Sequence, residues 1–163
     1  MIRLVQGTAT AVLAKKSLLS LLVFSLSCCA ATAGAQQEII MLPTRTGVTQ
    51  SFFLTSIPSS LQGVAVLFPG SGGLIQLRSE NGKPRFNQGN FLVRSRTEFI
   101  KRKIVAAILD APSDQQDGWG MGDDFRLGDA HFTDISAVIE DLEKRFPRVP
   151  LFLIGTSRGT ISA

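Results

Sequence analysis

Pro150-Leu-Phe-Leu-Ile-Gly-Thr-Ser-Arg-Gly-Thr-Ile-Ser-Ala163 is the stretch that decides how this chain folds. Its first apolar residues, Leu151 to Ile154, have the length and composition of a buried β-strand. They run directly into Gly155-Thr-Ser-Arg-Gly159, and small residues typical of a helix start follow. Glycine on both sides of Ser157 indicates a sharp strand-to-helix turn, because a Cβ at either flank would clash with the neighbouring backbone. We therefore predict a strained backbone conformation at Ser157.

A second glycine-rich segment follows another strand. Val64 to Phe68 is a continuous apolar run, as expected for a central strand covered on both faces, and it ends in Pro69-Gly-Ser-Gly-Gly73. A phosphate-binding loop is the alternative interpretation of these glycines. A dinucleotide fingerprint would need a small residue at position 75, which is Ile75, and a P-loop would need Lys-Ser/Thr after the glycine. We therefore favour a loop that brings backbone N–H groups close to a substrate.

Together, the two segments resemble the α/β-hydrolase superfamily, whose nucleophile lies in a G-x-S-x-G turn after a strand. The resemblance implies that Ser157 is the nucleophile and that the N–H groups of Ser71 and Arg158 form the oxyanion hole. It also makes Gly70, Gly72, Gly73, Gly155 and Gly159 the motif glycines. The family typically has His-Gly at the start of the first loop, where this chain has Pro69-Gly70.

The order of elements predicts an α/β fold with a mostly parallel sheet flanked by helices. A hairpin is expected from strands at 38–42 and 51–55, joined by a connection over 43–49. The chain between 76 and 90 is polar and predicts an exposed loop, followed by a helix over 90–102 and a buried strand over 104–109. A long polar loop over 113–127 then precedes an amphipathic helix. Its predicted buried stripe consists of Phe132, Ile135, Val138, Ile139, Leu142 and Phe146.

The first 35 residues have the features of a secretory signal peptide. A positive region with Arg3, Lys15 and Lys16 precedes the apolar run 18–26, and Ala33-Gly-Ala35 resembles a cleavage site. The run is too short to span a bilayer comfortably. We expect a mature domain over 36–163 that is exported to the periplasm or secreted, with lipid attachment at Cys28 or Cys29 as the less favoured alternative.

Export would leave a chain with no cysteine and little net charge. From Gln36 onward there are 14 Lys and Arg residues against 13 Asp and Glu residues, so no basic excess argues for nucleic acid. No second apolar segment suggests a membrane span after signal cleavage. The expected partner is a small-molecule ester or other acyl substrate, and neither a metal nor another cofactor is expected.

The superfamily's other catalytic residues are not where the resemblance would place them. An acid and a histidine should follow the serine, but the one histidine, His131, precedes it. We interpret His131 as an N-terminal residue of a helix, bonded to solvent or to Asp134, with a place near the pocket rim as a substitute base as the less favoured alternative. Asp110 is interpreted as a helix- or loop-capping residue, and lining the pocket is the less favoured alternative for it. The acidic residues Asp123, Asp124 and Asp129 predict a solvated loop rather than a metal site. Trp119 and Phe125 are either a lid over the substrate or anchors of the loop.

We therefore expect the first part of an α/β-hydrolase domain, with acyl transfer to water as the activity of the complete protein. The chain as written is expected to be inactive or nearly so, because Ser157 lacks its base. Acyl transfer to another acceptor is an open alternative. A second alternative is a non-catalytic binding or accessory protein on the same scaffold.

Overall fold

The computed structural model describes residues 37–163, so the predicted signal peptide lies outside the described part of the chain. The strands and helices there follow one another in the order β1 (Glu38–Arg45), β2 (Val48–Leu54), β3 (Gly63–Phe68), β4 (Arg78–Glu80), β5 (Lys83–Arg85), α1 (Phe91–Lys101), β6 (Ile104–Leu109), α2 (Asp123–Arg126), α3 (Asp129–Arg145) and β7 (Leu151–Gly155). Two short 3₁₀ helices are added at Ser113–Gln115 and Ser157–Ile161. In this part of the chain, no helix combines the length and apolar character needed to cross a membrane.

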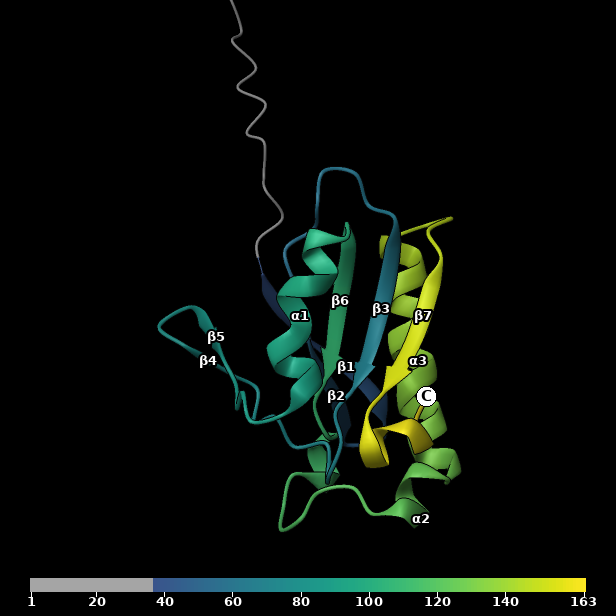
Figure 1. Ribbon diagram of the computed structural model, residues 1–163. Coiled ribbons are helices and arrows are strands. Elements are labelled where there is room, and N and C mark those ends of the chain that lie inside the picture. Colours follow the sequence, from purple (N-terminus) through teal and green to yellow (C-terminus); the bar gives the residue numbers. More distant parts are fainter. Residues whose placement is uncertain (1–36) are drawn as a thin grey trace, which may run out of the picture. The chain divides into compact units, whose positions relative to one another are not determined.

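Five strands form one mixed sheet in the order β1-β2-β6-β3-β7 (Figure 1). β3 pairs in parallel with β6 on one side and with β7 on the other. β1 and β2 form the predicted antiparallel hairpin, and β2 also pairs antiparallel with β6. The α/β class is confirmed. The sheet is mixed, with parallel pairing on both sides of β3 and antiparallel pairing on both sides of β2.

The two long helices cover opposite faces of this sheet (Figure 1). Alternate residues of a strand point to opposite faces, and β3 shows this clearly. Val64, Val66 and Phe68 belong to the core under α3, whereas Ala65 and Leu67 belong to the core under α1. The continuous apolar runs in β3 and β6 are therefore explained by burial on both sides.

The amphipathic helix is confirmed as α3, with one residue wrongly assigned. Ile135, Val138 and Leu142 are buried, as predicted, but Phe132 is 72% exposed. Position 132 lies at the start of the helix, before the stripe reaches the sheet. The helix predicted over 90–102 is confirmed as α1, whose N-cap Asn90 accepts a hydrogen bond from the Leu92 N–H.

Two further predictions are corrected by the structure. The exposed stretch 76–90 contains the hairpin β4–β5 rather than a loop, because Asn81-Gly82 forms a turn in which both residues have positive φ, 53° and 71°. The strand β7 is not buried as predicted. It pairs only with β3 among the described strands, and Phe152 and Leu153 are 49% and 38% exposed.

Candidate functional site

The candidate site lies where the parallel strands end. The carboxyl ends of β3, β6 and β7 point the same way, and the segments that follow them gather at the lower end of Figure 1. The chain leaves β3 for β6 on one side and later returns to β7 on the other side, so β3 and β7 flank a topological switch point. Ligands of open α/β sheets bind at such points. Phe68 and Gly155 are register partners, so the two glycine-rich segments begin side by side.

Ser157 occupies the strained turn that the sequence predicts. Its φ is 52°, in the left-handed region that costs a residue with a Cβ roughly 1–2 kcal/mol, and its side chain is exposed. A Cβ on Gly155 would lie 2.3 Å from the Gly159 carbonyl oxygen, and one on Gly159 would lie 2.1 Å from that of Phe68. The prediction that both flanks need glycine for steric reasons is therefore confirmed by the geometry of the turn.

The Gly70–Gly73 loop lies against this turn. A Cβ on Gly70 would lie 3.1 Å from the Ser157 Cβ, so the two segments are in contact. The loop closes through a hydrogen bond from the Gly73 N–H to the Gly70 carbonyl, and Ser71 has a φ of 56°. No partner within residues 37–163 accepts the Ser71 N–H. Arg158 is in the first turn of the 3₁₀ helix 157–161, where N–H groups have no partner inside the helix.

Asp110 holds the chain after Gly73 in place, in the loop-capping role that the sequence predicts. It is buried at the carboxyl end of β6, and its carboxylate accepts the N–H groups of Ile75, Leu77 and Ala111. The donor–acceptor distances lie between 2.7 and 2.9 Å. Asp110 thus fixes the chain that leaves the Gly70–Gly73 loop by bonding its backbone.

Arg126 connects the two glycine-rich segments, and the sequence analysis missed it. Its guanidinium donates to the Pro69 and Ser71 carbonyls on one side and to the Ser162 hydroxyl on the other. It is 4% exposed, and this burial lowers its pKa. The only available signal was an arginine between Phe125 and Leu127 in a polar segment, which is equally typical of a solvated surface.

His131 is not bonded to solvent or to Asp134, so the prediction for its environment is wrong. It is 1% exposed, and its Nε2 lies 2.9 Å from the Ser162 Oγ. Asp134 is instead paired with Arg45 at 2.9 Å, an interaction that raises the pKa of Arg45. Burial, followed by the positive charge of Arg126, lowers the pKa of His131 to about 4. His131 is therefore a neutral imidazole at neutral pH, and its Nε2 shares a hydrogen bond with the Ser162 hydroxyl.

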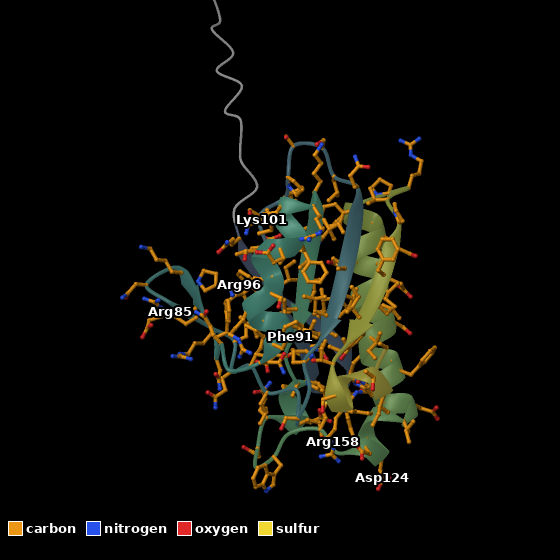
Figure 2. All side chains as sticks on the ribbon, in the orientation of Figure 1. Arg85, Phe91, Arg96, Lys101, Asp124 and Arg158 are labelled. Carbon is orange, nitrogen blue, oxygen red and sulfur yellow. The ribbon has the colours of Figure 1, made fainter. Side chains whose placement is uncertain are left out.

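The three acidic residues after Gly122 do not act together. Asp123 receives a hydrogen bond from the Arg158 side chain at 2.7 Å, which lowers the Asp123 pKa and ties α2 to the Ser157 turn. Figure 2 shows Arg158 beside α2, which also carries the labelled Asp124. Asp129 begins α3. Within residues 37–163, no group of three or more His, Cys, Asp and Glu side chains is placed to hold a metal ion.

Trp119 and Phe125, which we predicted to be either a lid or anchors, have different environments. The Trp119 side chain is 91% exposed and does not anchor its loop to the core. Phe125 is half-buried, with its ring 5.5 Å from the His131 ring and 5.7 Å from the Arg45 guanidinium carbon. Only Phe125 therefore has a packing role.

A cavity of about 290 Å³ adjoins the Gly70–Gly73 loop. It is lined by Gly70, Ser71, Gly72, Leu74, Asn87, Gly89, Asn90, Gly118 and Trp119. Ser157 does not line the cavity itself, but Gly70, which does, contacts Ser157.

Comparisons with known proteins do not assign this chain to a family. No model of a known protein family matches the chain, and no curated protein matches it significantly.

Proposed function

We propose that this protein is an exported serine hydrolase of the α/β-hydrolase type, acting on an ester or another acyl substrate. The observation that carries the proposal is the backbone of Ser157. A non-glycine residue held at positive φ in a tight strand-to-helix turn stores strain, and such strain is typical of functional sites. The turn exposes the hydroxyl beside a loop with an unbonded N–H, as nucleophilic acyl transfer requires.

In the proposed reaction, the Ser157 Oγ attacks the carbonyl carbon and the carbonyl oxygen becomes negatively charged. The N–H groups of Ser71 and Arg158 would donate to this oxyanion. Each such donor typically lowers the barrier by about 2.7–4 kcal/mol. The leaving group departs with a proton, and water then releases the acyl group from Ser157. The one histidine of the sequence, His131, does not serve Ser157, because its Nε2 is engaged by Ser162.

The contact between Ser162 and His131 favours a second candidate nucleophile. A serine hydroxyl within hydrogen-bond reach of a neutral imidazole is the arrangement that activates a nucleophile. Arg126 also donates to the Ser162 Oγ and would stabilise its ionised form. However, Ser162 is only 8% exposed, so a substrate carbonyl would reach it only after local opening of the chain. Ser157 is therefore the preferred nucleophile.

A fluorophosphonate probe applied to the protein distinguishes these candidates. We expect a covalent adduct on Ser157 by mass spectrometry, absent from Ser157→Ala and retained in Ser162→Ala. An adduct on Ser162 would show that Ser162, and not Ser157, is the nucleophile. A folded protein without any adduct would favour the non-catalytic binding or accessory alternative. Acyl transfer to another acceptor is detected by supplying an alcohol and measuring ester exchange against hydrolysis.

The signal-peptide features of the first 35 residues support export, and a separate experiment tests it. We propose cleavage after Ala35, which would give a mature protein starting at Gln36. N-terminal sequencing of the protein from the periplasm or the culture medium should find this residue. Retention of lipid on Cys28 or Cys29 would instead support anchoring.

A further inference from the structure

The cavity beside the Gly70–Gly73 loop has the chemistry of a site for a neutral, hydroxylated ligand. None of its nine lining residues is charged, so a phosphate or carboxylate group would find no counter-ion there. Only Leu74 and Trp119 contribute apolar side chains, which is too little for a long acyl chain. Its volume of about 290 Å³ is at the small end of the range of about 300–1,000 Å³ for ligand sites.

Two asparagine side chains supply hydrogen-bond donors to this cavity. The Asn87 Oδ1 accepts the Gly89 N–H at 2.8 Å, and the Asn90 Oδ1 accepts the Leu92 N–H at 3.0 Å. These bonds use the oxygen of each amide and fix its orientation. Neither NH₂ group has a partner within residues 37–163, so both are available to ligand hydroxyl groups.

Trp119 is presented at this cavity by a fixed backbone. The Met121 N–H donates to the Gly72 carbonyl at 2.9 Å, and the flanking Gly118 and Gly120 have φ values of 59° and 75°. A Cβ on Gly72 would lie only 1.5 Å from the Trp119 carbonyl oxygen, so the two loops are in direct contact. The indole nevertheless remains 91% exposed. Because Trp119 also lines the cavity, its exposed indole offers an apolar ring face to a ligand bound there.

We propose that this cavity binds the sugar ring of the substrate, so that the protein acts on an acyl ester of a neutral carbohydrate. One apolar face of the ring would stack on Trp119, and its hydroxyl groups would accept hydrogen bonds from Asn87 and Asn90. The ester linkage would then lie toward Ser71 and Ser157. The substrate class rests on the proposed function, whereas binding of the sugar ring does not.

Intrinsic fluorescence tests the binding directly, because Trp119 is the one tryptophan of the chain and there is no tyrosine. Ser157→Ala protein, which lacks the proposed nucleophile, is titrated with methyl glucoside, methyl xyloside and methyl ferulate. We expect a saturable change with at least one glycoside. Asn87→Asp and Asn90→Asp should each weaken binding about fivefold, the effect of one neutral hydrogen bond.

These two variants keep the acceptor oxygen that bonds Gly89 or Leu92, so the loop and the cap of α1 should persist, and circular dichroism verifies this. Phe132→Ala removes an equally exposed aromatic side chain on α3 and should leave binding unchanged. The proposal is overturned by the absence of a saturable response to either glycoside. It is also overturned if both aspartate variants bind as the parent does, or if only methyl ferulate binds. Sugar binding without fluorophosphonate labelling would support the sugar-binding site and contradict the proposed hydrolase activity.

Discussion

The strained serine should reveal itself in the stability of the protein. The positive φ of Ser157 costs the folded protein free energy, whereas glycine adopts the same conformation without a Cβ clash. We expect Ser157→Gly to raise the free energy of unfolding by about 1 kcal/mol while abolishing labelling. Chemical denaturation followed by circular dichroism measures this difference.

The matched control is Ser136→Gly, inside α3, where glycine should destabilise by about 0.5–1 kcal/mol. Equal losses in the two variants would show that Ser157 is not under backbone strain.

The buried His131 should make stability depend on pH. Its pKa is lowered in the folded protein to about 4, below the value of about 6.5 expected in the unfolded chain. Between these two values the unfolded chain binds more protons, so stability is complete above about pH 6.5 and falls as the pH decreases toward 4. The loss from this group is about 1.4 kcal/mol per pH unit.

His131→Gln should remove that part of the dependence, because glutamine does not titrate. Urea unfolding of both proteins between pH 7 and pH 4.5 provides the comparison. Parallel curves for the two proteins would rule out a buried neutral histidine.

Some residues of the candidate site could be predicted from the sequence and others could not. The turn at Ser157 could be predicted because steric exclusion of Cβ atoms leaves a local signature, glycine on both sides. Arg126 and Ser162 leave no such signature, since their contacts join segments 36 residues apart in a fold that the local pattern does not determine. His131 was misplaced for the same reason. Its burial depends on the packing of α3 against the segment after β7.

At the level of elements, Asp110 should prove essential for holding the chain after β3 against the end of β6. Asp110→Ala removes the acceptor of three backbone N–H groups and leaves those of Ile75 and Ala111 buried. Hydrogen bonds to a charged group are worth about 1.5–3 kcal/mol each, and the bonds are not additive. We therefore expect a loss of at least about 2 kcal/mol in the unfolding free energy.

Asp124→Ala, an exposed acidic residue on α2, should stay within about 0.5 kcal/mol of the parent. Hydrogen exchange at Ile75 and Leu77 should accelerate only in Asp110→Ala. Unchanged protection there would contradict the role assigned to Asp110.

Elements were predictable where burial or turn chemistry acts locally. β3, β6, α1 and α3 follow from apolar runs and helical spacing that the sheet then buries. The hairpin β4–β5 was missed because its side chains are polar, although Asn81-Gly82 is a strong turn signal. β7 has the same apolar composition as β3 but lies at the edge, and strand order in a sheet is a property of the whole fold.

For the whole molecule, the exposed edge at β7 predicts self-association. Within residues 37–163, β7 presents unpaired backbone groups together with two exposed apolar side chains, a combination that promotes strand pairing between molecules. Light scattering of the 163-residue protein should rise with concentration, and Phe152→Lys should reduce it.

Phe132→Lys is the control for this edge, since Phe132 is more exposed than Phe152 but lies on a helix without free strand groups. A similar reduction in both variants would attribute association to general hydrophobicity rather than to the edge.

The pairing of β3 with β7 also sets the order in which the molecule assembles. Val64 pairs with Leu151, although the hairpin β4–β5, the three helices and β6 all lie between these two residues in the sequence. Closing so long a segment is entropically slow, and contacts distant in sequence form late. Ribosomal synthesis delivers β7 after every other described strand. Ser157 therefore acquires its strained geometry only when β7 docks against β3, after the other described strands have been synthesised.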